Sequence, residues 1–404
     1  MHIWILIIAF PALSLIIFEY NEVNAYSRYQ CVVPALLTWQ SVNLPSDYLQ
    51  AVRLAVVNWN NVPSGLSLSE VSQDGNILIK RENKGDNRTP GITYFAQCDG
   101  TRRPLPVIIG LNSYYLDGYD ILRKQNVVSH ELGHAAAGLA HNIGTSTNSK
   151  ATLMYENDDS YNIYKIFAPT LDEIRGTQNI YGTTTPTSTC TPFTKNGSVT
   201  YNGTCSSNNP ALPINLKVLQ AGNNNYAFAS QYSSSQALPT VGTVMMTTKV
   251  NANTPHHFSM GIYTTSNFGD PYNRMITVRL DKSVRNGIQT SYIDTGGNLK
   301  IEYLWQGTIS TSSTYFLQIV IQQDSFSSPA GVYAYLDDGG GSTPPTYLGS
   351  KLVRSGILWN SYNVYYAVGA WSDNEYRLLS DYTVREREYY NRLRSYSWPY
   401  SSYS

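Results

Sequence analysis

Three histidines and one glutamate lie within the twelve residues HELGHAAAGLAH, 130–141, of a chain that has six histidines in all. On a helix, residues four apart lie one turn above another, so His130 and His134 can direct two imidazole nitrogens at one metal ion. Glu131 would stand beside the open coordination position. With a third protein ligand, such a site binds zinc, activates water and hydrolyses peptide bonds, and the pattern predicts this chemistry.

The residues after the second histidine supply a candidate third ligand. Gly138 comes where the helix must end, His141 follows that turn, and Met154 lies thirteen residues further on. We predict that His141 completes the ligand set. The alternative is a carboxylate ligand from Asp172 or Glu173, but both lie in the first turn of a predicted helix, where acidic residues serve the cap and the helix dipole.

These motifs resemble those of a matrixin-like zinc metallopeptidase of the metzincin clan. The resemblance covers residues of about 30–182 and rests on HELGH, GLAH, LDEIRGTQNIYG and LMY, the last being the loop called the Met-turn. It implies a mixed twisted sheet with three helices, and an edge strand around GITYFAQ that pairs with an extended polypeptide substrate. It also implies one catalytic Zn²⁺ with the ligands His130, His134 and His141. In the same resemblance Glu131 is the general base and Met154 lies beneath the metal.

The sequence departs from the matrixin pattern in three places. His141 follows His134 by seven residues where matrixins have six, so one alanine is extra. We expect a π-type turn across Ala135–Ala137, or one more helical residue, to absorb it. MYENDDSY lacks the usual proline, and Tyr161 becomes the candidate for the wall of the specificity pocket. A long cysteine-switch prodomain has no room before Cys31, so latency is not predicted.

The N-terminal residues and the cysteines predict export. An apolar run over residues 3–18 and small residues up to Ala25 indicate a signal peptide, 1–25, with an uncleaved membrane anchor as the alternative. Four cysteines without a C-x-x-C pair favour two disulfides in an oxidising compartment: Cys31, Cys98, Cys190 and Cys205. A disulfide between Cys190 and Cys205 would close a local loop, which leaves Cys31 to pair with Cys98. We therefore expect a secreted, extracellular protein.

The remaining patterns of the first half predict an α+β domain, 26–182. Residues 46–60 carry apolar side chains at helical spacing, and LSLSEV, NILIK, GITYFAQ and PVIIGLN follow as four strands. The metal-binding segment is helical again. Thr170 and Glu173 stand in capping-box register at the start of a last helix, which ends at Gly182.

The second half predicts an all-β domain. TTTPTST, 183–189, lacks any large apolar side chain and begins a linker and disulfide loop that extends to residue 205. From 206 to 382, seven or more alternating stretches separated by turn residues indicate an antiparallel β-sandwich of jelly-roll or lectin-like kind. Residues 383–404 form a C-terminal tail. Because the linker has no apolar residues to join the halves, we expect the second half to fold alone.

These features predict a secreted, monomeric zinc endopeptidase. The 28 basic and 28 acidic residues give no net field that would attract nucleic acid. The alternative is a cell-surface protein whose sandwich binds a glycan or protein while its peptidase half is degenerate, but the intact Glu131 argues against it. Asp337 and Asp338 indicate a turn rather than a structural Ca²⁺ site. His256 and His257 indicate a pair at the edge of a strand rather than a second metal site.

Overall fold

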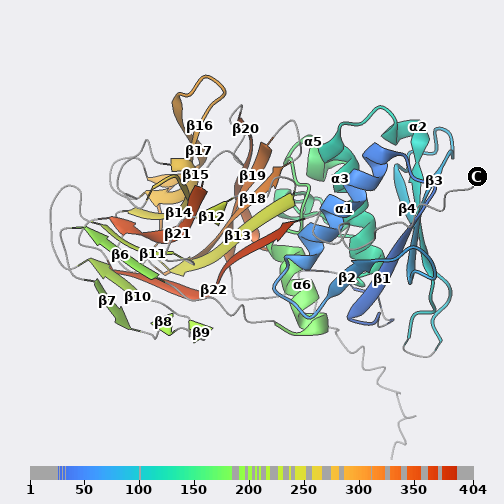
Figure 1. Ribbon diagram of the computed structural model, residues 1–404, viewed down its shortest axis with the longest axis horizontal. Helices are drawn as coiled ribbons and strands as arrows, with labels where there is room; N and C mark the ends of the chain where they lie inside the picture. Colours follow the sequence, from blue (N-terminus) through green and yellow to red (C-terminus); the bar gives the residue numbers. More distant parts are fainter. Residues whose placement is uncertain are drawn as a thin grey trace, which may run out of the picture.

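The computed structural model describes most of the chain between Tyr26 and Glu388, in these ranges: 26, 28–29, 31, 33–99, 102–183 and, with gaps, 191–388. Figure 1 shows a five-stranded sheet, then the main helices, then two larger sheets that face each other. No helix in the described ranges is long and apolar enough to cross a membrane. The predicted signal peptide, 1–25, lies outside these ranges.

A mixed sheet forms one side of the first half. Its strand order is β2-β1-β3-β5-β4, with β4 antiparallel and the other pairs parallel. The strands are β1 (Leu36–Val42), β2 (Ser67–Glu70), β3 (Ile77–Glu82), β4 (Gly91–Tyr94) and β5 (Val107–Asn112). The last four were predicted. β1 was missed, because only Leu37 and Trp39 of it are buried, which leaves a short alternating pattern.

The helices lie between this sheet and the second half (Figure 1). They are α1 (Ser46–Asn60), α2 (Ser113–Leu116), α3 (Ile121–Ala135), α4 (Thr147–Lys150), α5 (Asp159–Asn162) and α6 (Leu171–Tyr181). α1 packs along α3, where Trp59 Nε1 donates to Ser129 O at 2.9 Å. α6 has the predicted ends: Glu173 Oε2 accepts from Thr170 N at 2.8 Å, and Gly182 follows with a φ of 77°.

Two antiparallel sheets form the second half, as predicted. One has the order β20-β19-β18-β13-β22-β10-β7 and the other β17-β16-β15-β14-β21-β11-β6, with β12 beside β21 and β8 paired with β9. Their bounds are β6 (Thr191–Lys195), β7 (Val199–Asn202), β8 (Cys205–Ser206), β9 (Asn209–Pro210), β10 (Asn215–Val218), β11 (Tyr226–Ser230), β12 (Gln236–Ala237), β13 (Gly242–Asn251), β14 (His257–Tyr263), β15 (Arg274–Asp281), β16 (Gly287–Ile293), β17 (Leu299–Gln306), β18 (Thr314–Gln323), β19 (Ser328–Asp337), β20 (Thr346–Ser355), β21 (Asn363–Trp371) and β22 (Glu375–Glu388).

The sheets extend beyond the bounds that we predicted for the sandwich. β6 and β7 lie within the residues assigned to the linker and disulfide loop, 183–205, and both join the large sheets. β22 continues into the residues assigned to the tail, 383–404, because it pairs with β13 as far as Glu388. Strand pairing, which depends on partners far away in the sequence, therefore sets these boundaries.

Three strands of the seven-stranded sheet, β13, β18 and β19, have buried side chains on both faces, which was not predicted from the sequence. Successive residues of a strand point to opposite faces. On β18, Leu317 and Ile319 lie in the core between the two large sheets, and Phe316 lies in the core of the first half. The residues of this sheet in the first half's core are Met245, Phe316, Val320, Tyr333 and Tyr335. A sheet face joins the halves, so the composition of the linker gave no basis for expecting independent folding.

Polar contacts also connect the halves. Asp337, at the end of β19, pairs with Arg175 of α6 and with Lys249 Nζ of β13, the latter at 3.0 Å. The pair with Arg175 spans the interface between the halves, and the pair with Lys249 lies within the second half. The predicted disulfide between Cys31 and Cys98 is present. The predicted partner of Cys205, Cys190, lies outside the described residues.

Candidate metal centre

α3 and the turn after it bring the three predicted histidines together. One nitrogen from each of His130, His134 and His141 lies within 4.8 Å of the other two. The Nε2 atoms of His130 and His141 are 3.1 Å apart. Two nitrogens that bind the same tetrahedral zinc at 2.0–2.1 Å are about 3.3 Å apart, so this spacing fits one ion. The cluster contains neither Asp172 nor Glu173, the carboxylates of the alternative ligand set.

Backbone carbonyls determine which imidazole nitrogens face the cluster. His130 Nδ1 lies 2.9 Å from Leu153 O, and His134 Nδ1 lies 2.7 Å from Leu139 O. A carbonyl can only accept, so both Nδ1 atoms carry the proton and both Nε2 atoms keep a lone pair. Partners of this kind orient metal-binding histidines in proteins. The residues present therefore fit a zinc ion.

Burial favours the neutral form of these imidazoles. It lowers the pKa of His130 to about 4, and it lowers the pKa of His134 as well. Burial is also the main cause that lowers the pKa of His141. A neutral imidazole is the form that binds a metal, so the site needs little proton release at neutral pH before it can take up an ion.

The extra alanine widens the turn that ends α3. Ala136 N donates to Leu132 O at 2.8 Å, as in an α-helix, and Ala137 N donates to the same carbonyl at 3.2 Å, five residues back. This second bond is of the π type, one of the two alternatives expected from the sequence. Gly138 then leaves the helix with a φ of 69°, which glycine adopts without strain. The wider turn still carries His141 to the cluster.

Glu131 lies between α3 and the edge strand β4. Thr93 Oγ1 donates to Glu131 Oε2 at 2.6 Å. A Cβ atom on Gly91 would lie 2.8 Å from Glu131 Cγ and Oε1, so the strand approaches this closely only because it has glycine there. Burial raises the pKa of Glu131 to about 7, and the bond from Thr93 acts in the opposite direction. A carboxyl group with that pKa can take up and return a proton at neutral pH.

Met154 lies against α3, where a Cβ atom on Gly133 would overlap its sulfur. Its backbone N donates to Glu173 Oε1 at 3.0 Å, and its O accepts from Asn142 N at 2.8 Å. The Glu173 carboxylate thus holds the Met-turn and also accepts from Thr170 N. The capping role of Glu173 was predicted from the sequence, whereas its bond to Met154 was not, because that bond depends on how α6 packs.

A cavity of about 370 Å³ opens beside His130 and Glu131. Residues next to β4 line one side, and the segment from Tyr155 to Ser160 lines the other. Tyr161, the residue predicted for the pocket wall, is not among the lining residues; its hydroxyl donates to Asp120 Oδ1 at 3.1 Å. Neighbouring residues on the one-turn helix α5 point to different sides, so Ser160 lines the cavity while Tyr161 faces the interior.

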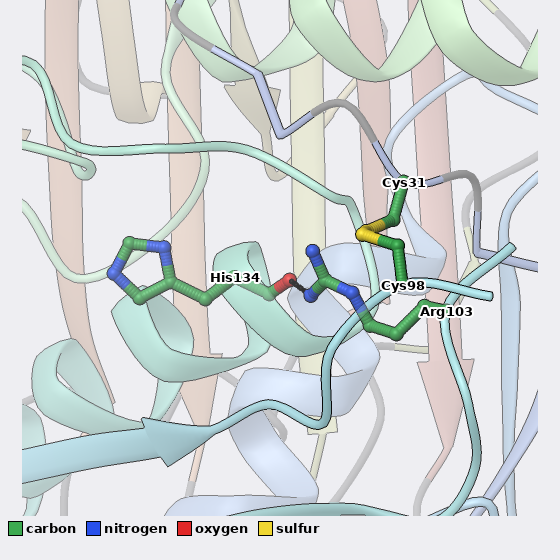
Figure 2. The surroundings of a disulfide bond; sticks show 4 residues. All are labelled: Cys31, Cys98, Arg103 and His134. Carbon is green, nitrogen blue, oxygen red and sulfur yellow. Dashed lines mark hydrogen bonds between the residues drawn. A yellow bond between two sulfur atoms is a disulfide. The ribbon is translucent and has the colours of Figure 1, made fainter. Parts of the chain in front are cut away.

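A buried arginine that the sequence analysis missed supports the end of α3. Arg103 donates from Nη1 to His134 O at 3.1 Å, as Figure 2 shows. Its guanidinium carbon lies 3.8 Å from the ring centre of Phe95 and 4.9 Å from that of Tyr29. The disulfide in the same view joins the segments that carry these two rings. A cation at a helix C-terminus is favourable, so this cluster stabilises the backbone of a candidate metal ligand.

Comparisons with known proteins give no family for this chain. No protein-family model and no curated protein matches the sequence. Among solved structures, myroilysin matches 38% of this chain and 97% of its own at 10% identity, with a TM-score of 0.28. A Lotus tetragonolobus seed lectin matches 49% of this chain and 99% of its own at 11% identity, also with a TM-score of 0.28. TM-scores this low support no functional inference, so the function has to be argued from the site.

Proposed function

We propose that this protein is an exported zinc-dependent endopeptidase. The observation that carries the proposal is the convergence of His130, His134 and His141 within 4.8 Å, with Glu131 beside them. The Nε2 atoms of His130 and His141 lie 3.1 Å apart, a spacing that suits two ligands of one zinc ion. When bound, zinc supplies a Lewis acid that polarises the peptide carbonyl and lowers the pKa of water towards about 7.

The chain's own residues would perform the remaining tasks. Glu131 takes a proton from the attacking water and returns it to the leaving amine, while Thr93 holds the carboxylate in place. The outer edge of β4 offers backbone N–H and C=O groups to an extended substrate. The cavity beside His130 accepts one substrate side chain. The Cys31–Cys98 disulfide supports the export part of the proposal, because such bonds persist in oxidising compartments.

The proposal is tested with a peptide library, purified protein and the variant Glu131→Gln. The wild type should cleave peptides, a zinc chelator should stop cleavage, and added zinc should restore it. Glu131→Gln should bind one zinc per chain with wild-type affinity and lose hydrolysis, since Glu131 moves protons and does not hold the ion. Cleavage by this variant at the wild-type rate would refute the mechanism. A wild type that binds no zinc would refute the proposal as a whole.

A further inference from the structure

Side chains of the second half bond to backbone carbonyls along the segment that carries the Met-turn and the cavity wall. These bonds reach residues 151–169 from three strands of the seven-stranded sheet. They are Tyr335 OH to Ala151 O at 3.1 Å, Ser350 Oγ to Tyr164 O at 2.7 Å, Tyr333 OH to Lys165 O at 3.1 Å, and Gln318 Nε2 to Pro169 O at 2.9 Å. The sheet thus holds a segment that has little regular structure of its own.

We propose that the second half positions the metal ligand His130 and that Tyr335 is the residue through which it acts. Tyr335 OH donates to Ala151 O, and two residues further along the Met-turn Leu153 O accepts from His130 Nδ1 at 2.9 Å. The backbone two residues before the carbonyl that orients the imidazole is therefore held from β19. This inference rests on the proposed function, because it concerns the same metal site.

Tyr335 is well suited to this role because it is rigid. Its side chain is fully buried, and its ring lies 5.8 Å from that of Tyr347 and 6.4 Å from that of Phe316. Ala151 and Leu153 are fully buried too, so water does not replace a lost bond at Ala151 O. Without the hydroxyl, the turn gains freedom to rotate Leu153 O away from the imidazole, and the lone pair of His130 Nε2 is then less well aimed at the ion.

The neighbouring Tyr333 offers a matched control. It is on the same strand and face, it is also buried, and its hydroxyl also donates to a backbone carbonyl at 3.1 Å. Its partner Lys165 is eleven residues beyond Met154, and the carbonyl of Lys165 accepts no bond from a histidine in the described part of the chain. Tyr333→Phe and Tyr335→Phe therefore each remove one buried hydroxyl group that donates to a backbone carbonyl. Only Tyr335→Phe removes a bond two residues before the carbonyl that accepts from His130.

Zinc affinity of the two full-length variants, measured by competition with a chromogenic chelator, tests the inference. Tyr335→Phe should bind zinc about tenfold more weakly, at the low end of the 10–100-fold loss for direct partners of metal ligands. Its kcat should fall while KM changes little. Tyr333→Phe should lose similar thermal stability and keep wild-type zinc affinity. Equal zinc affinities for the two variants would overturn the inference, although a zinc-binding, active wild type would leave the proposed function intact.

A second measurement needs no variant. Coupling between two sites is reciprocal, so zinc binding should slow amide hydrogen exchange on β19 as well as in α3 and the Met-turn. The wild-type chain is compared with and without zinc. Slower exchange around Tyr335 supports the inference even if Tyr335→Phe does not fold. Protection confined to α3 and the Met-turn would overturn it.

Discussion

Replacing Gly91 by alanine should slow catalysis while leaving the metal bound. The new methyl carbon would lie 2.7 Å from Val127 Cγ1 and 2.8 Å from Glu131 Oε1. Carbon atoms in ordinary contact are about 3.5–4.0 Å apart, so α3 and β4 must separate by about 0.8 Å or more, or the Val127 and Glu131 side chains must turn aside. Either response moves the carboxylate relative to the histidines.

The size of the effect follows from this displacement. A misplacement of 1 Å can cost about 100-fold in rate, so we expect kcat to fall about 10–100-fold. Overpacking costs about 1–3 kcal/mol in the free energy of unfolding, offset in part by about 0.5–1 kcal/mol for removing a glycine from a strand. Zinc affinity should stay at the wild-type value, because the atoms nearest to the new methyl group belong to Val127 and Glu131 and not to the three histidines.

The assay compares kcat, KM and zinc content for Gly91→Ala and for a matched control, Gly118→Ala. A Cβ atom on Gly118 meets its nearest neighbour, Tyr115 O, at 3.6 Å, an ordinary contact. The control should therefore keep the wild-type kcat. If Gly91→Ala also keeps it, the approach of β4 does not position Glu131 and the reasoning fails. Joint loss of zinc and activity would show that the substitution damages the whole site.

Two further predictions concern the ligand set and the metal itself. His141→Ala should weaken zinc binding steeply in the chelator competition, because it removes one of three ligands, whereas Asp172→Asn should bind as the wild type does; the opposite result would favour a carboxylate ligand. Chelation of zinc should also lower the melting temperature in scanning calorimetry, since a ligand at 1,000 times its Kd stabilises the fold by about 4 kcal/mol. An unchanged melting temperature would indicate that the folded chain holds no zinc.

Local patterns were sufficient to identify the candidate ligands. His130 and His134 are one helical turn apart, so any helix through them brings both imidazoles to one side. The capped start of α6 and the break at Gly138 are likewise properties of a few adjacent residues. The signal at each of these positions depends on near neighbours in the sequence, and the structure places them as expected.

The residues that hold the site were not predictable in the same way. Thr93 and Gly91 reach Glu131 because β4 pairs with β5 in one register and packs on α3. Arg103 reaches His134 O across a disulfide-linked cluster, and its surrounding sequence has no periodic pattern. Contacts of this kind depend on how separate elements pack, which a single sequence does not display.

The same distinction applies to the whole chain. The sequence by itself determined the helix that carries His130 and His134, the strands that alternate with period two, and the change to an all-β second half, because each shows as a local pattern along the chain. The stretch YFLQIVIQQ is apolar on both sides of its strand, which is a sign of burial on both faces that was not used in the prediction. Only the tertiary structure decided that Tyr335 and its neighbours cover the first half, because burial of a sheet face depends on what packs against it.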